Sequence, residues 1–137
     1  MGFEQFGFVS YVSQAKIGKF TEYLKNNRLM GTKCKKCGKV YFPPRGDCTS
    51  CFGEEIEWIE MKGEGKLVTY TEVNFAPTGF QDDVPYILAL GQLNSGHYVF
   101  ARFAKDVQME QVKSGMAIQL VPFRIDEERI TYEFQIP

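Results

Sequence analysis

The sequence has almost no excess of charge of either sign. Sixteen Lys and Arg residues stand against seventeen Asp and Glu residues, which gives a formal net charge of −1. Proteins that bind nucleic acids or anionic membranes by general electrostatic attraction carry a broad positive surface. The overall charge therefore argues against both functions and leaves room only for a local basic patch.

Long apolar runs are also absent. No stretch reaches the roughly 18 apolar residues of a membrane-spanning helix, and the amino terminus lacks the charged and apolar regions of a secretory signal. Phe6 stands where the myristoylation pattern needs Ser or Thr. We expect a cytoplasmic protein without a membrane partner, in a compartment where thiols stay reduced.

Histidine is scarce, since His97 is the only one. A single histidine could act as a general base, but this one follows a hairpin turn and has no Ser or Cys free to pair with it. The carboxylate pairs Asp82–Asp83 and Glu127–Glu128 lie in turn-like segments, where charges are usually solvated. Because no catalytic constellation emerges, we expect no intrinsic enzyme activity.

Cysteine is scarce as well, but its spacing is informative. The four cysteines form two Cys-x-x-Cys pairs separated by ten residues: Cys34, Cys37, Cys48 and Cys51. Two such turns bring four sulfur atoms to one tetrahedral ion, as in a zinc ribbon. Redox or iron chemistry is the functional alternative, but four thiolates leave no position open for substrate, so we predict structural zinc.

The ribbon depends on this metal. A module this short cannot fold by apolar burial alone, and zinc binding supplies about 10–16 kcal/mol in such modules. Gly38 stands where the first knuckle needs a positive φ. In the second pair, Phe52 separates Cys51 from Gly53, so we expect a turn one residue wider.

The segments around the ribbon predict a mainly β fold. Residues 1–30 are predicted to form an N-terminal helical or docking segment. Within it, residues 1–16 are Phe-rich and either dock on a partner or fold back on their own core. Residues 17–29 have the apolar periodicity of a helix, which Gly31 should end. The ribbon occupies residues 31–62, with strands near 40–42 and 55–60.

Residues 63–137 predict a five-stranded barrel. The strand-like runs are residues 66–75, 86–93, 97–103, 117–123 and 129–136. Turns are expected at residues 94–96 and 126–128, and a helical turn within 107–113. In the first run, Leu67 should share a face with Thr69 and Thr71. The long interruption between the third and fourth runs favours a Greek-key barrel of the OB type.

Several stretches resemble a prokaryotic family that joins a rubredoxin-like zinc ribbon to an OB-fold. The resemblance covers the chain from about residue 17 onward, and its most specific part is the run CKKCGKVYFPPR at residues 34–45. Trp58, GEGKLVTYT at 63–71 and APTGF at 76–80 continue it.

This resemblance implies a role in acyl-CoA metabolism. Members of the family look like partners of thiolase-type condensing enzymes or MaoC-like hydratases, so we expect a noncatalytic scaffold or CoA-binding subunit. Basic residues near the first knuckle could meet the phosphates of CoA, with a nearby aromatic ring for the adenine. The residues expected at the CoA site are Lys35, Lys36, Lys39, Phe42, Arg45 and, on the apolar loop between the first two barrel strands, Phe80.

A second interpretation remains open. Zinc ribbons and OB-folds both occur in proteins that bind single-stranded nucleic acids. Such a protein usually has a broad basic surface, whereas the barrel segment carries more acidic than basic residues. The scaffold is therefore our first prediction and the nucleic-acid binder the alternative.

Overall fold

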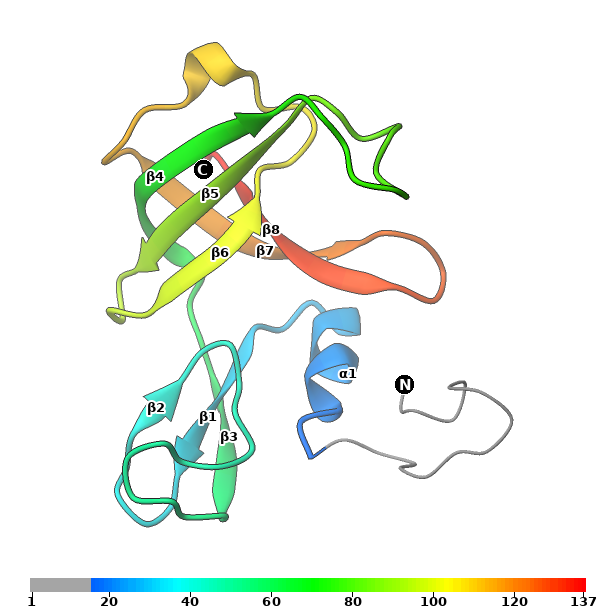
Figure 1. Ribbon diagram of the computed structural model, residues 1–137. Helices are drawn as coiled ribbons and strands as arrows, with labels where there is room; N and C mark the ends of the chain where they lie inside the picture. Colours follow the sequence, from blue (N-terminus) through cyan, green and yellow to red (C-terminus); the bar gives the residue numbers. More distant parts are fainter. Residues whose placement is uncertain (1–15) are drawn as a thin grey trace. The chain divides into compact units, whose positions relative to one another are not determined.

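The computed structural model describes residues 16–137, and these form two compact units (Figure 1). The first unit contains the chain up to Met61 together with Arg124–Thr131, and the second contains Lys62–Phe123 with Tyr132–Pro137. All of the predicted docking segment except Lys16 lies outside the described residues.

The first unit consists of a short helix and a three-stranded antiparallel sheet. Helix α1 (Lys19–Lys25) precedes strands β1 (Met30–Cys34), β2 (Val40–Tyr41) and β3 (Ile56–Glu60), which lie in the order β2-β1-β3. The helix is shorter than the predicted 17–29 because the chain leaves helical geometry at Asn26 and turns at Asn27, which has φ of 59°. Asparagine tolerates this left-handed conformation better than most residues.

Gly31 has a different role from the predicted one. It lies within β1 rather than at the end of the helix, opposite Ile59 of β3. A Cβ atom at this position would lie 2.6 Å from the backbone oxygen of Tyr41. Glycine is therefore needed here because two backbones approach closely, not because a helix must stop.

Aromatic side chains join the helix to the sheet of the ribbon. Phe20 meets Phe42 edge-on with ring centroids 6.1 Å apart, and Tyr23 lies 5.3 Å from Trp58. Leu24 of the same helix is buried. The helix therefore gives the ribbon a small apolar core, to which Phe42 belongs.

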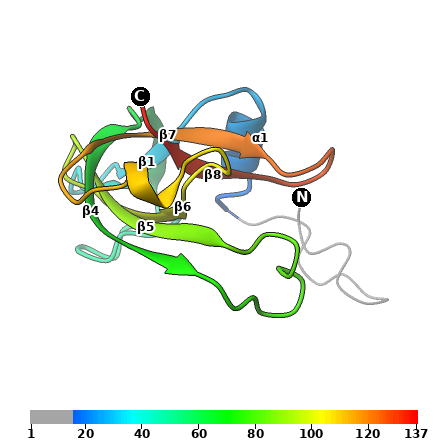
Figure 2. The same ribbon diagram turned by 90° about the horizontal axis from the view of Figure 1, so that it is seen from above.

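The second unit is a five-stranded sheet that curls into a nearly closed barrel. Its strands are β4 (Glu64–Val73), β5 (Tyr86–Leu93), β6 (Tyr98–Arg102), β7 (Ala117–Arg124) and β8 (Ile130–Gln135), in the order β6-β5-β4-β7-β8. A parallel bridge between Phe103 and Phe134 brings the two ends of the sheet together. Figure 2 shows the β4–β5 pair on one side of the barrel and β7 on the other. The predicted OB-type barrel is confirmed, and a 3₁₀ turn, η1 (Met109–Gln111), occupies the predicted helical position.

One prediction about β4 is wrong. The register shifts between Leu67 and Thr69, so Leu67 opposes Gly91 whereas Thr69 opposes Leu90. Leu67 therefore points into the barrel, and Thr69 and Thr71 lie on the exposed side. A β-bulge adds one residue to a strand and reverses the faces beyond it, which simple alternation cannot anticipate.

The barrel has its own apolar core. Its most deeply buried side chains come from all five strands and are Leu67, Leu93, Val99, Ile118, Leu120 and Phe134. The only α-helix among residues 16–137 has seven residues, far fewer than a helix needs to cross a membrane.

Candidate functional site: a four-cysteine metal centre

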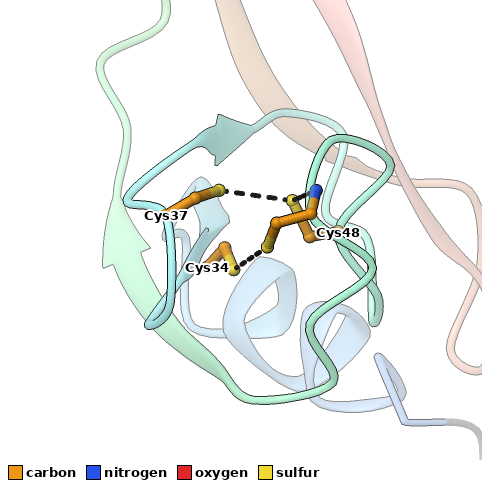
Figure 3. A group of neighbouring side chains, drawn as sticks. Cys34, Cys37 and Cys48 are labelled. Carbon is orange, nitrogen blue, oxygen red and sulfur yellow. Dashed lines mark hydrogen bonds between the residues drawn. The ribbon is translucent and has the colours of Figure 1, made fainter.

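The four cysteines converge as the spacing predicted. Their sulfur atoms all lie within 4.8 Å of one another, with 3.6 Å between Cys34 and Cys51 and 3.4 Å between Cys37 and Cys48. Zinc held by four sulfurs at about 2.3 Å needs sulfur separations of roughly 3.8 Å. Figure 3 shows Cys34, Cys37 and Cys48 directed toward one another. The cluster thus fits a closed tetrahedral zinc site.

The two knuckles have the same backbone geometry. The amide of Gly38 donates to the carbonyl of Cys34 at 2.9 Å, and the amide of Phe52 donates to the carbonyl of Cys48 at 3.1 Å. The bonds in the opposite direction match as well: the amide of Cys34 donates to the carbonyl of Lys39, and the amide of Cys48 donates to the carbonyl of Gly53. The predicted wider second turn is therefore wrong. Phe52, with φ of 60°, takes the left-handed position that Gly38 takes with φ of 80°.

Tyr41 supports the metal ligands and was missed in the sequence. Its hydroxyl lies 3.3 Å from the sulfur of Cys48 and accepts a 2.9 Å hydrogen bond from the amide of Thr49. The Tyr41 hydroxyl and the amide of Cys51 lower the pKa of Cys48 to about 5, which favours the thiolate that zinc requires. No spacing rule marks a tyrosine on the preceding strand as a partner of the second knuckle.

Cys37 shows the opposite shift. The amide of Lys39 lowers its pKa, but hydrogen bonding to Cys48 and the other cysteines outweighs this effect and raises the pKa to about 11. Two adjacent thiolates repel each other, so one thiol of this 3.4 Å pair holds its proton more tightly. Zinc bound by the four cysteines would replace that proton and let both sulfurs act as thiolates.

The cations predicted at the CoA site are exposed, but the predicted aromatic ring is not. Lys35, Lys36, Lys39 and Arg45 all reach solvent. Lys39 and Arg45 lie over the ring of Tyr41, at 5.4 and 5.9 Å from its centroid. Phe42 is only 5% exposed and packs on Phe20, so it offers no free face to adenine. A ring buried in the ribbon core cannot serve as the predicted stacking surface.

The last residue of the predicted CoA site belongs to the second unit. Phe80 lies in the loop between β4 and β5, half exposed, with its ring 6.5 Å from that of Tyr86. Phe75 in the same loop is almost fully exposed. The loop therefore leaves apolar side chains in solvent, next to one end of the β4–β5 pair.

The solvent side of β5 and β6 is apolar too. Leu88 and Leu90 on β5 alternate with buried residues and oppose Arg102 and Phe100 on β6. Phe100 is 64% exposed and Tyr98, two residues before it, 57%. We call Leu88, Leu90, Tyr98 and Phe100 the barrel face. The outer side of an antiparallel sheet is usually polar when only water covers it.

A charge cluster at the end of β6 was also missed. Arg102 lies 3.9 Å from Asp83 and over the ring of Phe123, and Lys105 pairs with Asp83 at 3.0 Å. The Lys105 contact holds the pKa of Asp83 below its usual range. Burial raises the pKa of Glu133 nearby, an effect that Arg102 partly offsets. These residues are far apart in sequence, so no local pattern marks them.

His97 does have a serine neighbour, which corrects the sequence analysis. The hydroxyl of Ser95 lies 2.8 Å from Nδ1 of His97, in the turn between β5 and β6. The two residues are only two positions apart, and Ser95 is exposed. A serine and a histidine two positions apart in an exposed turn do not by themselves make a nucleophilic site, which requires a base that a third group orients.

Two family models match consecutive parts of the chain. The model of the ChsH2 rubredoxin-like zinc ribbon domain matches residues 21–57, and the model of the ChsH2 C-terminal OB-fold domain matches residues 58–123. Together they span residues 21–123, which include most of both units.

Similar proteins have names that point to assemblies. A DUF35 domain-containing scaffold protein from Methanocaldococcus jannaschii is 38% identical over 112 residues, which is 78% of this chain and 79% of the relative. A protein from Geobacter metallireducens named benzoylsuccinyl-CoA thiolase subunit BbsA is 29% identical over 110 residues, 78% of this chain and 73% of the relative.

A solved structure has the same fold. It is described as Ltp2-ChsH2(DUF35) aldolase, has a TM-score of 0.74 and 22% identity, and the match covers 92% of this chain and 97% of that one. At this identity the likeness establishes the fold alone.

Proposed function

Since the chain belongs to the DUF35 family of rubredoxin-like zinc-ribbon and OB-fold proteins, we propose that it is a noncatalytic accessory subunit of an acyl-CoA enzyme. The enzyme would be of the thiolase type, as the name of the similar thiolase subunit suggests, or a MaoC-like hydratase. The chain would hold the complex together and help to bind its CoA substrate.

The barrel face is the observation that carries this proposal. Leu88, Leu90, Tyr98 and Phe100 form an apolar surface on the outside of a sheet that already has a complete core of its own. Exposed apolar surface of this kind favours a protein interface. The same face, on the second and third barrel strands, is where OB-folds commonly bind oligonucleotide or oligosaccharide ligands; these strands are β5 and β6 here. A scaffold needs such surfaces and needs no catalytic groups.

CoA would be held in the complex by the cations of the ribbon. Lys35 and Lys36 lie on the first knuckle, and Lys39 and Arg45 lie over the ring of Tyr41. Ammonium and guanidinium groups bind phosphate oxygens through charge-assisted hydrogen bonds. Zinc would fix the knuckles that present these side chains.

The phosphate contacts can be tested by removing two charges. The double substitution Lys35→Ala, Lys36→Ala should weaken CoA binding to the assembled complex by roughly tenfold, about 1.4 kcal/mol, as measured by isothermal titration calorimetry. The matched control is Lys19→Ala, Lys25→Ala, which removes two exposed charges from α1. Equal CoA affinity in both double variants would refute the phosphate contacts.

Co-purification from the native host tests the proposed function itself. A tagged chain should recover an acyl-CoA enzyme subunit, and the two purified proteins should form a complex of fixed stoichiometry by light scattering. The purified chain alone should turn over no acyl-CoA. Turnover by the chain alone, or a chain that binds no such subunit, would contradict the proposal.

The barrel face also keeps the second candidate open. Exposed aromatic side chains on OB strands two and three can stack on the bases of single-stranded nucleic acids. Such a site needs free cations along the backbone, yet Arg102 and Lys105 beside this face are paired with Asp83. A titration with single-stranded DNA and RNA at low salt decides, because a nucleic-acid binder must bind there and lose affinity steeply as salt rises.

A further inference from the structure

Phe52 is placed where a glycine would suit the free protein better. It is 82% exposed, and its backbone has φ of 60°. Gly38 occupies the equivalent position of the first knuckle, with the same hydrogen bonds around it. A side chain in this left-handed region strains the backbone, and an exposed ring gains nothing from burial. The first knuckle therefore shows that glycine can occupy this position. Phe52 is unfavourable there for two reasons, the strain of its backbone and the exposure of its apolar ring.

Exposed cations lie on the neighbouring knuckle, which contacts the one that carries Phe52. A Cβ atom at Gly53, the next residue, would lie 3.5 Å from Cβ of Lys36 and 3.3 Å from the sulfur of Cys34. The two knuckles thus touch directly beside Phe52. In the part of the chain that the structure describes, neither Lys35 nor Lys36 takes part in an ion pair. The tip of the ribbon combines one apolar ring with unpaired positive charge.

We propose that Phe52 is the anchor with which the zinc ribbon docks into an apolar pocket of the acyl-CoA enzyme subunit, beside the phosphates of the CoA held there. The inference rests on the proposed function and names the contact that function requires. Buried aromatic anchors supply much of the binding energy at protein interfaces. The strain at Phe52 is offset when the ring leaves water and enters the pocket.

The surroundings of Phe52 favour a protein pocket over a small molecule. Thr49 and Ser50 on the same knuckle are exposed, as Phe52 is, so among the described residues the ring projects into solvent. Sites for small molecules are concave and enclose most of their ligand. A protruding ring instead fits a hollow on a partner. The charge of Lys35 and Lys36 complements the phosphates at the edge of that hollow.

The test compares substitutions at Phe52 in the free protein and in the complex. Phe52→Gly should raise the melting temperature of the zinc-loaded free protein by about 2–5 °C, because it relieves the left-handed strain. The same substitution, and Phe52→Ala, should weaken binding to the co-purified enzyme subunit at least about thirtyfold, the effect of a typical anchor residue. Phe52→Trp should bind within about threefold of the natural chain, since it keeps an aromatic ring.

The matched control is Ser50→Ala, which changes another exposed side chain of the same knuckle. It should leave the affinity for the enzyme subunit unchanged. The titrations are repeated without CoA, where the loss caused by Phe52→Gly should persist. Binding of Phe52→Gly within twofold of the natural chain would overturn the proposal, as would a fall in its melting temperature.

Two further outcomes separate a failure of the anchor proposal from a failure of the proposed function. If Phe52→Gly lowers the affinity of the free chain for CoA and leaves the protein complex intact, the ring stacks on CoA and the anchor proposal is wrong. If the natural chain binds no acyl-CoA enzyme subunit at all, the proposed function itself fails.

Discussion

At the scale of single residues, Glu133 is the most unusual side chain of the barrel. It lies on β8, only 4% exposed, and within the described residues its Oε2 atom has no hydrogen-bond partner. Burial raises its pKa, Arg102, Gln135 and Lys105 oppose this effect, and Asp106 adds to it. Burying a carboxylate disfavours its charged form, so the folded protein binds this proton more tightly than the unfolded chain does.

This shift predicts a pH dependence of stability that Glu133→Gln should remove. A raised folded pKa adds stability that is complete below the unfolded value, near 4.3, and is lost as the pH rises through the folded value. The melting temperature of the natural chain relative to Glu133→Gln should therefore increase as the pH falls from 7.5 to about 4.3. The effect amounts to about 1.4 kcal/mol for each unit of difference between the two pKa values.

Thermal unfolding at matched pH values measures this difference, and effects common to both chains, such as zinc release, cancel. Glu72→Gln provides a control, because Glu72 lies exposed on β4. A constant difference between the natural chain and Glu133→Gln across this range would show that the proton affinity of Glu133 does not change on folding.

At the scale of elements, the barrel depends on how closely β5 approaches its core. A Cβ atom at Gly91 would lie 2.4 Å from Cδ1 of Ile118 and 2.8 Å from Cζ of Phe134. Both of these side chains are fully buried, so neither can move into solvent. Gly91→Ala should therefore lower the free energy of unfolding by about 1–3 kcal/mol, the usual cost of overpacking a core.

Denaturant unfolding followed by circular dichroism measures this change. Thr71→Ala on the exposed side of β4 should change the stability by less than about 0.5 kcal/mol. If Gly91→Ala proved as stable as the natural chain, the barrel interior would have to contain more space than this packing allows.

The elements themselves could be predicted because their signals are local. Alternating apolar residues and turn residues placed the five barrel strands, and Cys-x-x-Cys spacing placed the knuckles. The bulge in β4 could not be predicted, since it depends on pairing with β5 rather than on β4 alone. Phe52 could not be predicted either, because its left-handed backbone contradicts the usual preference of a bulky residue.

At the scale of the whole molecule, the sequence predicted only those site residues that lie close together along the chain. The cysteines lie within eighteen residues of one another and were identified together. Asp83, Arg102 and Glu133 come from three distant segments that the barrel brings together. The barrel face was missed for the same reason, because it exists only once β5 and β6 are paired in register.

The two units obtain their stability from different sources, and removing the metal should reveal this. The ribbon has few buried apolar side chains beyond its cysteines and the residues that contact α1, so it relies on zinc binding, about 10–16 kcal/mol in such modules. The barrel has a core that includes Leu67, Ile118 and Phe134. None of these side chains is a metal ligand.

Chelation of zinc should therefore unfold the ribbon and leave the barrel folded. In nitrogen–proton correlation spectra, the amide signals of β1–β3 should collapse toward unfolded positions, while those of β4–β8 remain dispersed. Cys34→Ser should give the same pattern without a chelator, and elemental analysis of the natural chain should find one zinc per molecule. Iron in its place, or a ribbon that keeps its dispersed signals without metal, would contradict this view, because four thiols alone would repel one another once ionised and could not hold the knuckles together.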